Sequence, residues 1–360
     1  MTPHILPFRW IAGLIVAGLM LTTPAPGTAG DWVPATGNLA NLASECGNLC
    51  HIFPVPNSPK VIAGVAGAGL WATSNGGATW SKLGAADLSI RNRPQQILYD
   101  PGNADIFWEV GIYTGPGVVK TTDGGRTFRP VGDISHNDSL GIDFTDPQRR
   151  TLIATGHETE RKLYKSTNAG MTFTEIGTNL PAGANITSGC LVLDARTYVV
   201  ACWGWGKPGG IWRTTDGGTN WTRVCDQTPT PGGFVLRTTK GALFCGSESG
   251  NRLLKGSPDG ATWSSLAAPG ARRVTPIELP GGAMATLGND GIMVSADEGA
   301  TWRTVAPGLP IPKADGITVG GLAYNAVTGS AYVWFWDCGN VVRPDAIWRC
   351  DIVLPPKPGN

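Results

Sequence analysis

Six short segments of this chain share one order of residues, in which apolar side chains lead directly into a polar turn. The segments read GLWATS, GVVKTT, KLYKST, GIWRTT, RLLKGS and GIMVSA, and they begin at Gly69, Gly117, Lys162, Gly210, Arg252 and Gly291. Short apolar runs bounded by turn residues are typical of strands. No part of the chain has the pattern of a long amphipathic helix, so the sequence predicts an all-β protein.

A turn phrase, Ser/Thr-x-Asp/Asn-x-Gly-x-Thr-Trp/Phe, begins at or next to the last residues of each segment and continues beyond it. Its carboxylate or amide side chain can bond backbone N–H groups of the turn, and its glycines supply positive φ. The closing aromatic residues lie about 40 to 48 residues apart, which is the length of one four-stranded propeller blade. The six copies occupy residues 73–80, 121–128, 166–173, 214–221, 257–263 and 295–302.

A seventh blade is present in two pieces at the two ends of the chain. The segment AIWRCD at 346–351 repeats the strand that precedes each turn, but no closing aromatic follows it. Trp32, Val33 and Pro34 resemble the strands that follow the turns, such as TWSKLG and TFRPVG. We therefore predict a single seven-bladed β-propeller whose ring is closed by the N-terminal strand, so that no free sheet edge remains inside it.

The first thirty residues do not follow the repeat. Arg9 precedes an apolar run at 10–21, and small residues at Gly27 and Ala29 stand where a signal peptidase reads the chain. The run is too short for a membrane span, which needs about 20 apolar residues. We predict a signal peptide at 1–29, the propeller at 30–352, a C-terminal tail at 353–360, and a secreted or periplasmic location.

Charge is balanced, with 28 Lys and Arg residues against 27 Asp and Glu residues. This balance argues against nucleic acid or an anionic membrane as the main partner, because both require a basic face. The sequence therefore predicts no nucleic-acid partner, and no membrane partner after signal cleavage.

Eight cysteines, an even number, suit an oxidising compartment. Metal binding is disfavoured because only three histidines follow the signal, and the chain has no Cys-x-x-Cys or HExxH motif. We therefore predict no metal site and no cofactor. The cysteines fall into local pairs, and we expect disulfides between Cys46 and Cys50, Cys190 and Cys202, Cys225 and Cys245, and Cys338 and Cys350.

Five of the fourteen tryptophans are not required by the repeat. Trp108 ends the second strand of blade two, and two pairs, at 203/205 and 334/336, end the second strands of blades four and seven. Residues two apart on a strand point to the same side, so each pair could present two indole faces to a sugar ring. Packing between blades explains the same residues equally well.

Charged side chains are densest in loops of blades two and three that gather on one face of a propeller. Glycosidic cleavage needs one carboxyl that protonates the leaving oxygen and a second that acts as base or nucleophile. Simple solvation of an exposed rim is the alternative. The candidate catalytic residues are Asp87, Glu109, Asp138 and Glu158, and the candidate ligand-binding residues are Arg91, Arg93, Tyr113, His136, His157, Arg161, Trp203, Trp205, Trp334 and Trp336.

The turn phrase resembles the Asp-box, or BNR, repeat of sialidases, xyloglucanase-type glycoside hydrolases, sortilin-type receptors and photosystem II assembly-factor propellers. Two further segments, LYDPGNADIFWEVG at 98–111 and DFTDPQRRTLIATG at 143–156, are similar to a strand-DP-turn-strand phrase of the hydrolases and sortilins. The resemblance implies that the Asp-boxes lie on the outer edge of the blades, away from the active face. It carries over no catalytic residue, because those hydrolases have two propellers with one catalytic Asp in each, and the Phe/Tyr-Arg-Ile-Pro motif of sialidases is absent.

These observations together favour a carbohydrate-active propeller. We expect a glycoside hydrolase-like protein that acts on an extracellular polysaccharide or oligosaccharide. The alternative is a non-catalytic propeller that binds a glycan or holds a protein partner, in the manner of an assembly factor. Hydrolysis requires two carboxyls that face one cleft, whereas a scaffold requires only a broad and mostly apolar patch.

Overall fold

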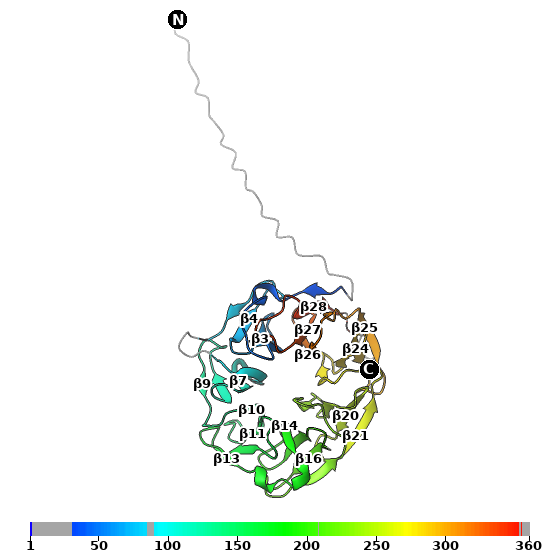
Figure 1. The fold of residues 1–360 in the computed structure, drawn as a ribbon. Helices are drawn as coiled ribbons and strands as arrows, with labels where there is room; N and C mark the ends of the chain where they lie inside the picture. The colour runs from blue at the N-terminus through cyan, green and yellow to red at the C-terminus, as the bar shows by residue number, and fades with distance from the viewer. Residues whose placement is uncertain (2–30, 85–89, 208, 353, 355–360) are drawn as a thin grey trace.

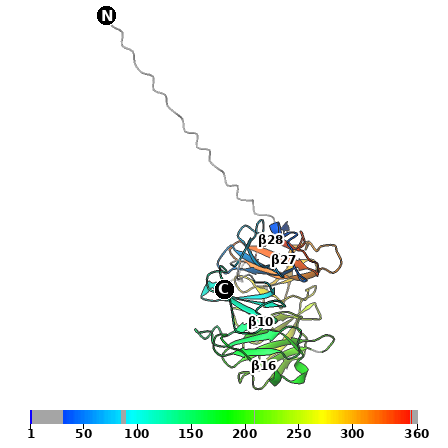
Figure 2. The ribbon, with the colours of Figure 1, turned by 60° about the vertical axis from the view of Figure 1, so that its left-hand side comes forward.

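A computed structural model of the chain shows seven four-stranded antiparallel sheets arranged in a ring around a central axis (Figure 1). Turning the ring by 60° brings it partly edge-on and shows its depth (Figure 2). The structure describes residues 1, 31–84, 90–207, 209–352 and 354. The predicted single seven-bladed β-propeller is confirmed, whereas the proposed signal peptide lies outside the described residues. Over the described ranges, no helix is long and apolar enough to cross a membrane.

Each blade is a meander in which consecutive strands pair from the axis outwards. Three short 3-10 helices, η1 (Gly37–Leu39), η2 (Gly177–Asn179) and η3 (Ala182–Ala184), lie between strands. Blade I consists of β2 (Leu49–Pro54), β3 (Val61–Val65), β4 (Gly69–Thr73) and β5 (Ser81–Lys82), blade II of β6 (Arg93–Asp100), β7 (Asn103–Ile112), β8 (Val118–Thr121) and β9 (Arg129–Pro130), and blade III of β10 (Asn137–Ile142), β11 (Leu152–Gly156), β12 (Leu163–Ser166) and β13 (Thr174–Glu175).

The remaining blades follow the same plan. Blade IV consists of β14 (Ile186–Val192), β15 (Tyr198–Trp203), β16 (Gly210–Thr214) and β17 (Thr222–Cys225), blade V of β18 (Leu236–Arg237), β19 (Leu243–Gly246), β20 (Arg252–Gly256) and β21 (Trp263–Ala267), blade VI of β22 (Ile277–Glu278), β23 (Met284–Leu287), β24 (Gly291–Ser295) and β25 (Arg303–Pro307), and blade VII of β26 (Thr318–Asn325), β27 (Ser330–Trp336), β28 (Ile347–Asp351) and β1 (Val33–Pro34).

The outer strand of blade VII comes from the N-terminal end of the chain, as predicted. In the β1–β28 pair, Val33 lies opposite Arg349 and Pro34 opposite Trp348. The pairing continues beyond the strand, because the backbone N–H of Ala35 donates to the Ile347 carbonyl at 2.9 Å. The ring is therefore closed by hydrogen bonds between segments that are more than 300 residues apart, such as Ile347 N–H to Thr36 Oγ1, with a separation of 311.

The repeated turns are held by their own polar side chains. In the copy at 121–128, Asp123 Oδ1 accepts from the Thr127 N–H at 2.9 Å and from the Thr121 hydroxyl at 2.8 Å. These hydrogen bonds favour the ionised carboxylate and lower the pKa of Asp123 to about 2. Gly125 takes φ 88°, and the closing Phe128 is buried. The turn residues thus serve the fold.

The meander places two kinds of loop on one face of the ring. The loops between the second and third strands of each blade, and the connections from one blade to the next, open on the same side, which we call the loop face. The repeated turns join the third and fourth strands and therefore lie on the opposite side.

The expected disulfide pairing between near neighbours is wrong. Cys46 bonds Cys338, 292 residues away, and the other six cysteines are free. The reason is geometric: Cys46 precedes the first strand of blade I and Cys338 follows the second strand of blade VII, so ring closure brings them together on the loop face. In the β14–β15 pair, Cys190 lies opposite Val200 and Cys202 opposite Thr187, so these two cysteines are out of register with each other.

Deleting residues 31–37 should lower the melting temperature by several degrees or cause aggregation, because it exposes the unpaired edge of β28. Circular dichroism melts and light scattering would measure both effects. Val33→Thr is the matched control, because the Val33 side chain is exposed and its backbone pairing is kept. A deletion variant that melts like the wild type would show that β1 does not close the ring energetically.

Candidate functional site

The candidate residues that the structure describes lie at the loop face or at the strand ends next to it. Asp87 lies outside the described residues. Arg91 is exposed in the connection from blade I to blade II. The remaining candidates separate into a cluster over blades II and III, a buried carboxyl in blade II, two half-buried arginines, and aromatic residues on blades IV and VII.

Five candidate residues come together where blades II and III meet, and we call them the blade II–III cluster: Tyr113, His136, Asp138, His157 and Glu158. The Tyr113 ring lies 5.3 Å from the His136 ring and 5.4 Å from the His157 ring, centroid to centroid. The two imidazoles are 5.2 Å apart. Tyr113 is 42% exposed, so an aromatic ring at the surface covers a pair of imidazoles.

Hydrogen bonds give the two imidazoles of the cluster opposite roles. His157 Nδ1 lies 2.8 Å from Asp138 Oδ1, so it donates its proton to the carboxylate, and Nε2 is left as an acceptor. His136 Nδ1 accepts from the backbone N–H of Tyr113 at 3.3 Å, so in the neutral ring Nε2 carries the proton and donates. One imidazole therefore presents an acceptor and the other a donor.

The acceptor nitrogen of His157 has no hydrogen-bond partner although it is buried. The nearest charged atom is Glu158 Oε1, which lies 3.7 Å from Nε2. A buried polar atom without a partner costs about 1 to 3 kcal/mol, and such atoms are rare in folded proteins. The cluster therefore keeps one unsatisfied acceptor directly beneath its surface.

The backbone of the cluster is held in an unusual conformation. Tyr113, His136 and Glu158 have φ of 70°, 64° and 50°, and the neighbouring Arg161 has φ of 52°. Residues other than glycine rarely adopt this left-handed region, and it costs of order 1 to 3 kcal/mol each where sterics oppose it. Four such residues in adjacent loops indicate that these loops do not take the turn conformation of lowest backbone energy.

Asp138 is buried, and burial raises the pKa of its carboxyl, while the hydrogen bond from His157 opposes that rise. Glu158 lies on the other side of the same imidazole and is about half exposed. The arrangement therefore places one buried and one solvated carboxyl on the two nitrogens of one ring.

Glu109 stands apart from the cluster. It lies on β7 and is fully buried, and Asn92 Nδ2 donates to its Oε2 at 3.1 Å while its Oε1 has no partner. Burial raises the pKa of Glu109 to about 8, and the Asn92 hydrogen bond offsets only part of this. A carboxyl sealed in this way has no route to a substrate.

The remaining charged candidates have structural contacts. The Arg93 guanidinium lies over the Trp336 ring at 4.9 Å, which is a cation–π contact. Arg161 donates from Nη1 to the Leu180 carbonyl at 3.2 Å. Both arginines are half-buried at the loop face, so their guanidinium groups are already partly engaged.

The tryptophan pairs are divided between core and surface. Trp203 and Trp334 are buried, and Trp334 donates from Nε1 to the Cys50 carbonyl at 2.8 Å across the seam between blades VII and I. Trp108 is also buried. Trp336 is half-buried, whereas Trp205 is 70% exposed and lies 4.8 Å from Trp203 between ring centroids. Trp205 alone of the four paired indoles presents an open face.

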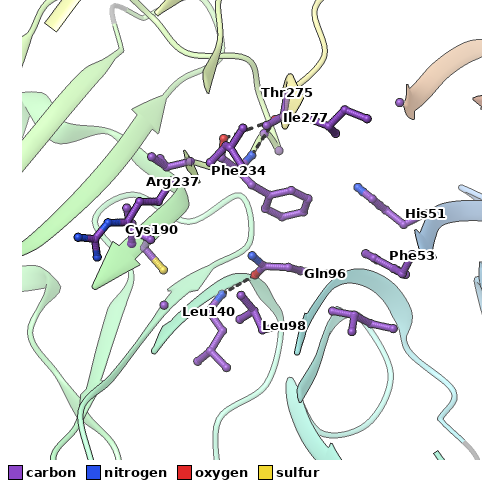
Figure 3. A pocket seen from close by; sticks show the side chains of 18 of the residues that line it. His51, Phe53, Gln96, Leu98, Leu140, Cys190, Phe234, Arg237, Thr275 and Ile277 are labelled. Atoms are coloured by element: carbon purple, nitrogen blue, oxygen red, sulfur yellow. Dashed lines mark hydrogen bonds between the residues drawn. The ribbon is translucent and has the colours of Figure 1, made fainter. Parts of the chain in front are cut away.

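A cavity that sequence reasoning did not identify runs along the axis, with a volume of about 610 Å³ (Figure 3). The innermost strands of all seven blades line it, and its lining includes His51, Phe53 and Phe234. The sequence offered one weak signal, a Gly232-Gly233 pair before Phe234 that lets a loop approach the axis closely. We call this cavity the axial channel.

Within the described part of the chain, no group of three or more His, Cys, Asp and Glu side chains is arranged to hold a metal ion. At the blade II–III cluster, the His157 nitrogen that faces Asp138 is used by that carboxylate.

No protein-family model and no curated protein sequence matches this chain. Solved structures share its fold. An ancestral GH74 enzyme matches 87% of this chain with a TM-score of 0.56 at 14% identity. YCF48 bound to D1 peptide matches 90% with a TM-score of 0.53 at 15% identity, and the extracellular domain of a hybrid two-component system from B. thetaiotaomicron matches 88% with a TM-score of 0.58 at 11% identity.

The matched proteins differ in length. The chain spans 45% of the ancestral GH74 enzyme and 41% of the two-component domain, but 98% of YCF48. At these identities the likeness shows the propeller fold alone.

Replacing Glu109 with Gln should make stability less sensitive to pH. The folded protein holds this proton more tightly than the unfolded chain, since the pKa is about 8 rather than 4.5, so the stabilisation is complete below about pH 4.5 and is lost as pH rises towards 8. The free energy of unfolding of Glu109→Gln relative to wild type should therefore rise across this range, by up to about 1.4 kcal/mol per pH unit. The melting temperature of the variant relative to wild type should rise with it. The two proteins should melt alike near pH 4.5, and parallel melting curves throughout would contradict a neutral Glu109.

Proposed function

We propose that the protein is a secreted or periplasmic propeller that binds glycans at the blade II–III cluster. The observation that carries the proposal is the pair of imidazoles with opposite hydrogen-bonding roles beneath the exposed ring of Tyr113. Neighbouring hydroxyls of a sugar need both a donor and an acceptor, and the apolar face of the sugar needs an aromatic ring.

The chemistry of the cluster suits a neutral polyol. A sugar hydroxyl can donate to His157 Nε2, which lacks a partner, and a neighbouring hydroxyl can accept from His136 Nε2. Glu158 stands beside His157 and adds a second acceptor, as bound sugars require. Satisfying the buried nitrogen of His157 would recover part of the cost of leaving it unpaired.

Binding is favoured over hydrolysis because two of the candidate carboxyls are already enclosed or engaged. Glu109 is sealed in the blade, and Asp138 is occupied by His157. The axial channel has no Asp or Glu among the residues that line it. A glycosidase needs two carboxyls on either side of the scissile bond, about 5 to 9.5 Å apart.

Trp205 extends the proposal along the loop face. It is exposed on blade IV, where it would stack on the further sugars of a long chain. Trp336 of blade VII, with Arg93 of blade II over its ring, would border the face. The proposed ligand is therefore a polysaccharide or long oligosaccharide. Similar solved structures include both a GH74 enzyme and a propeller bound to a peptide, so a protein partner on this face is the alternative.

Isothermal titration against a panel of neutral polysaccharides and their oligosaccharides tests the proposal. Tyr113→Ala and His157→Phe should each weaken glycan affinity by about tenfold or more, because each removes a contact worth about 1 to 3 kcal/mol. Trp205→Ala should weaken long ligands more than short ones. Met171→Ala, an exposed apolar side chain on a repeated turn of the opposite side, is the matched control and should bind normally. Equal affinity in Tyr113→Ala and Met171→Ala would contradict the site.

Glycoside hydrolysis is the second candidate, and one observation favours it. Asp138, whose pKa is raised by burial, and the solvated Glu158 lie on opposite sides of His157, so two carboxyls in different surroundings stand in one cluster.

If the cluster is hydrolytic, Asp138→Asn and Glu158→Gln should each reduce the release of reducing sugars at saturating glycan by about 10² or more while the melting temperature changes little. Assays of sugar release and titration on the same preparations separate the two functions. A wild-type protein that binds a glycan but releases no sugar from it would exclude hydrolysis and leave the binding function in place.

A further inference from the structure

Two blades that are not neighbours in the ring touch across its axis. Phe234, in the connection that leads into blade V, lies 5.3 Å from His51 of blade I between ring centroids. His51 also lies 5.3 Å from the rings of Phe53 and Trp334. Figure 3 shows the Phe234 and His51 side chains pointing towards one another from opposite sides of the cavity. We call these four residues the aromatic plug.

The aromatic plug lies towards the loop-face end of the axial channel. His51 is close to the start of β2, and Phe234 precedes β18, both on the loop side of the innermost strands. Phe234 is positioned by its backbone N–H, which donates to Thr275 Oγ1 at 3.1 Å (Figure 3). Gly232, two residues before Phe234, takes φ 66° and has open space where a side chain would stand.

The rest of the channel lining is mostly apolar, and its polar members are Gln96, Arg237 and three threonines. Leu98, Leu140 and Ile277 contribute to its wall, and the residues that line it include neither Asp nor Glu. Its volume of about 610 Å³ falls in the range of 300 to 1,000 Å³ of sites for small molecules. Such sites typically combine an apolar wall with a few polar groups that fix orientation.

Two polar atoms of the lining are buried without a hydrogen-bond partner. They are His51 Nδ1 and Thr230 Oγ1, from the same two regions of the chain that meet in the aromatic plug. Each is unfavourable while unpaired, and an occupant with hydrogen-bonding groups would satisfy them.

His51 is neutral in this setting. Burial and, to a smaller extent, the nearby charge of Arg93 together lower its pKa to about 3. A neutral imidazole in a wall without carboxylates offers no counter-charge to a cation, and the arginine of the lining, Arg237, is exposed to solvent. An uncharged ligand avoids the desolvation cost that an ion would meet.

We propose that the axial channel beneath the aromatic plug binds a neutral, largely apolar small molecule that carries a hydroxyl or N–H group, which hydrogen-bonds with His51. The apolar body of the ligand fills the channel between Leu98, Leu140 and Ile277. The channel site lies on the axis and its lining includes none of the blade II–III cluster, so this inference does not depend on the proposed glycan function.

Fluorescence titration with N-phenyl-1-naphthylamine, a neutral apolar probe with one N–H, tests the site. We expect saturable binding with one probe per chain. The related probe 1-anilinonaphthalene-8-sulfonate has the same aromatic frame plus a charge, and it should bind at least about tenfold more weakly. Equal affinities for the two probes would overturn the assignment of a neutral site.

Two variants locate the probe. His51→Phe keeps an aromatic ring in the plug and removes the nitrogen, so the neutral probe should bind about fivefold more weakly, as expected for one hydrogen bond. Ile277→Trp adds bulk to the half-buried channel wall and should abolish binding. Circular dichroism melts check the fold of both, and His51→Phe is decisive by itself if Ile277→Trp does not fold.

The matched control is Trp205→Ala, which removes the exposed indole of the loop face where an apolar probe would adhere non-specifically. It should bind the neutral probe like the wild type. Loss of binding in Trp205→Ala, or unchanged binding in folded His51→Phe, would overturn the channel site.

Discussion

The closure of the ring between blades VII and I is the constraint on which the rest of the structure depends. Three independent devices meet at this seam: the β1–β28 pairing, the Cys46–Cys338 disulfide, and the fully buried side chain of Asn48. Asn48 Nδ2 donates to Asp337 Oδ1 at 2.6 Å and to the Val341 carbonyl at 3.1 Å, so a residue of the connection into blade I is fastened to blade VII. Without closure, the innermost strands would have no fixed radius and no channel of defined width.

A closed ring also explains why the loop face tolerates unfavourable local features. Left-handed residues such as Tyr113 and His136, and a buried acceptor such as His157 Nε2, each cost free energy that local contacts do not recover. They persist because the strands on which these loops stand are fixed by packing between blades and by the repeated turns, whose hydrogen bonds are complete. The repeat thus stabilises the framework, so that the loop face can hold conformations that are not those of lowest local free energy.

The sequence was sufficient for the framework because the framework is periodic. Each copy of the turn phrase marks one blade, and the unpaired strands at 32–34 and 346–351 can only complete each other. The site was less accessible for two reasons. A strand pattern places both Glu109 and Asp138 near the loop face. It cannot show that Asn92 and neighbouring backbone enclose Glu109, or that the imidazole of His157 lies between Asp138 and the surface. Contacts across the axis, such as His51 with Phe234, join non-neighbouring blades and leave no periodic trace in the sequence.

Glu109 and Asp138 are both buried carboxyls, but their different surroundings give them different chemical possibilities. Burial raises the pKa of both Glu109 and Asp138, but only Asp138 has a titratable partner that continues towards solvent, through His157 to Glu158. A ligand that hydrogen-bonds with His157 Nε2 would alter the proton balance between His157 and Asp138, because the two share one hydrogen bond. Nothing that binds at the loop face reaches Glu109 by such a chain, since its only side-chain hydrogen bond comes from Asn92, which does not titrate. The blade II–III cluster is therefore the place on the described part of the loop face where ligand binding and protonation can be linked.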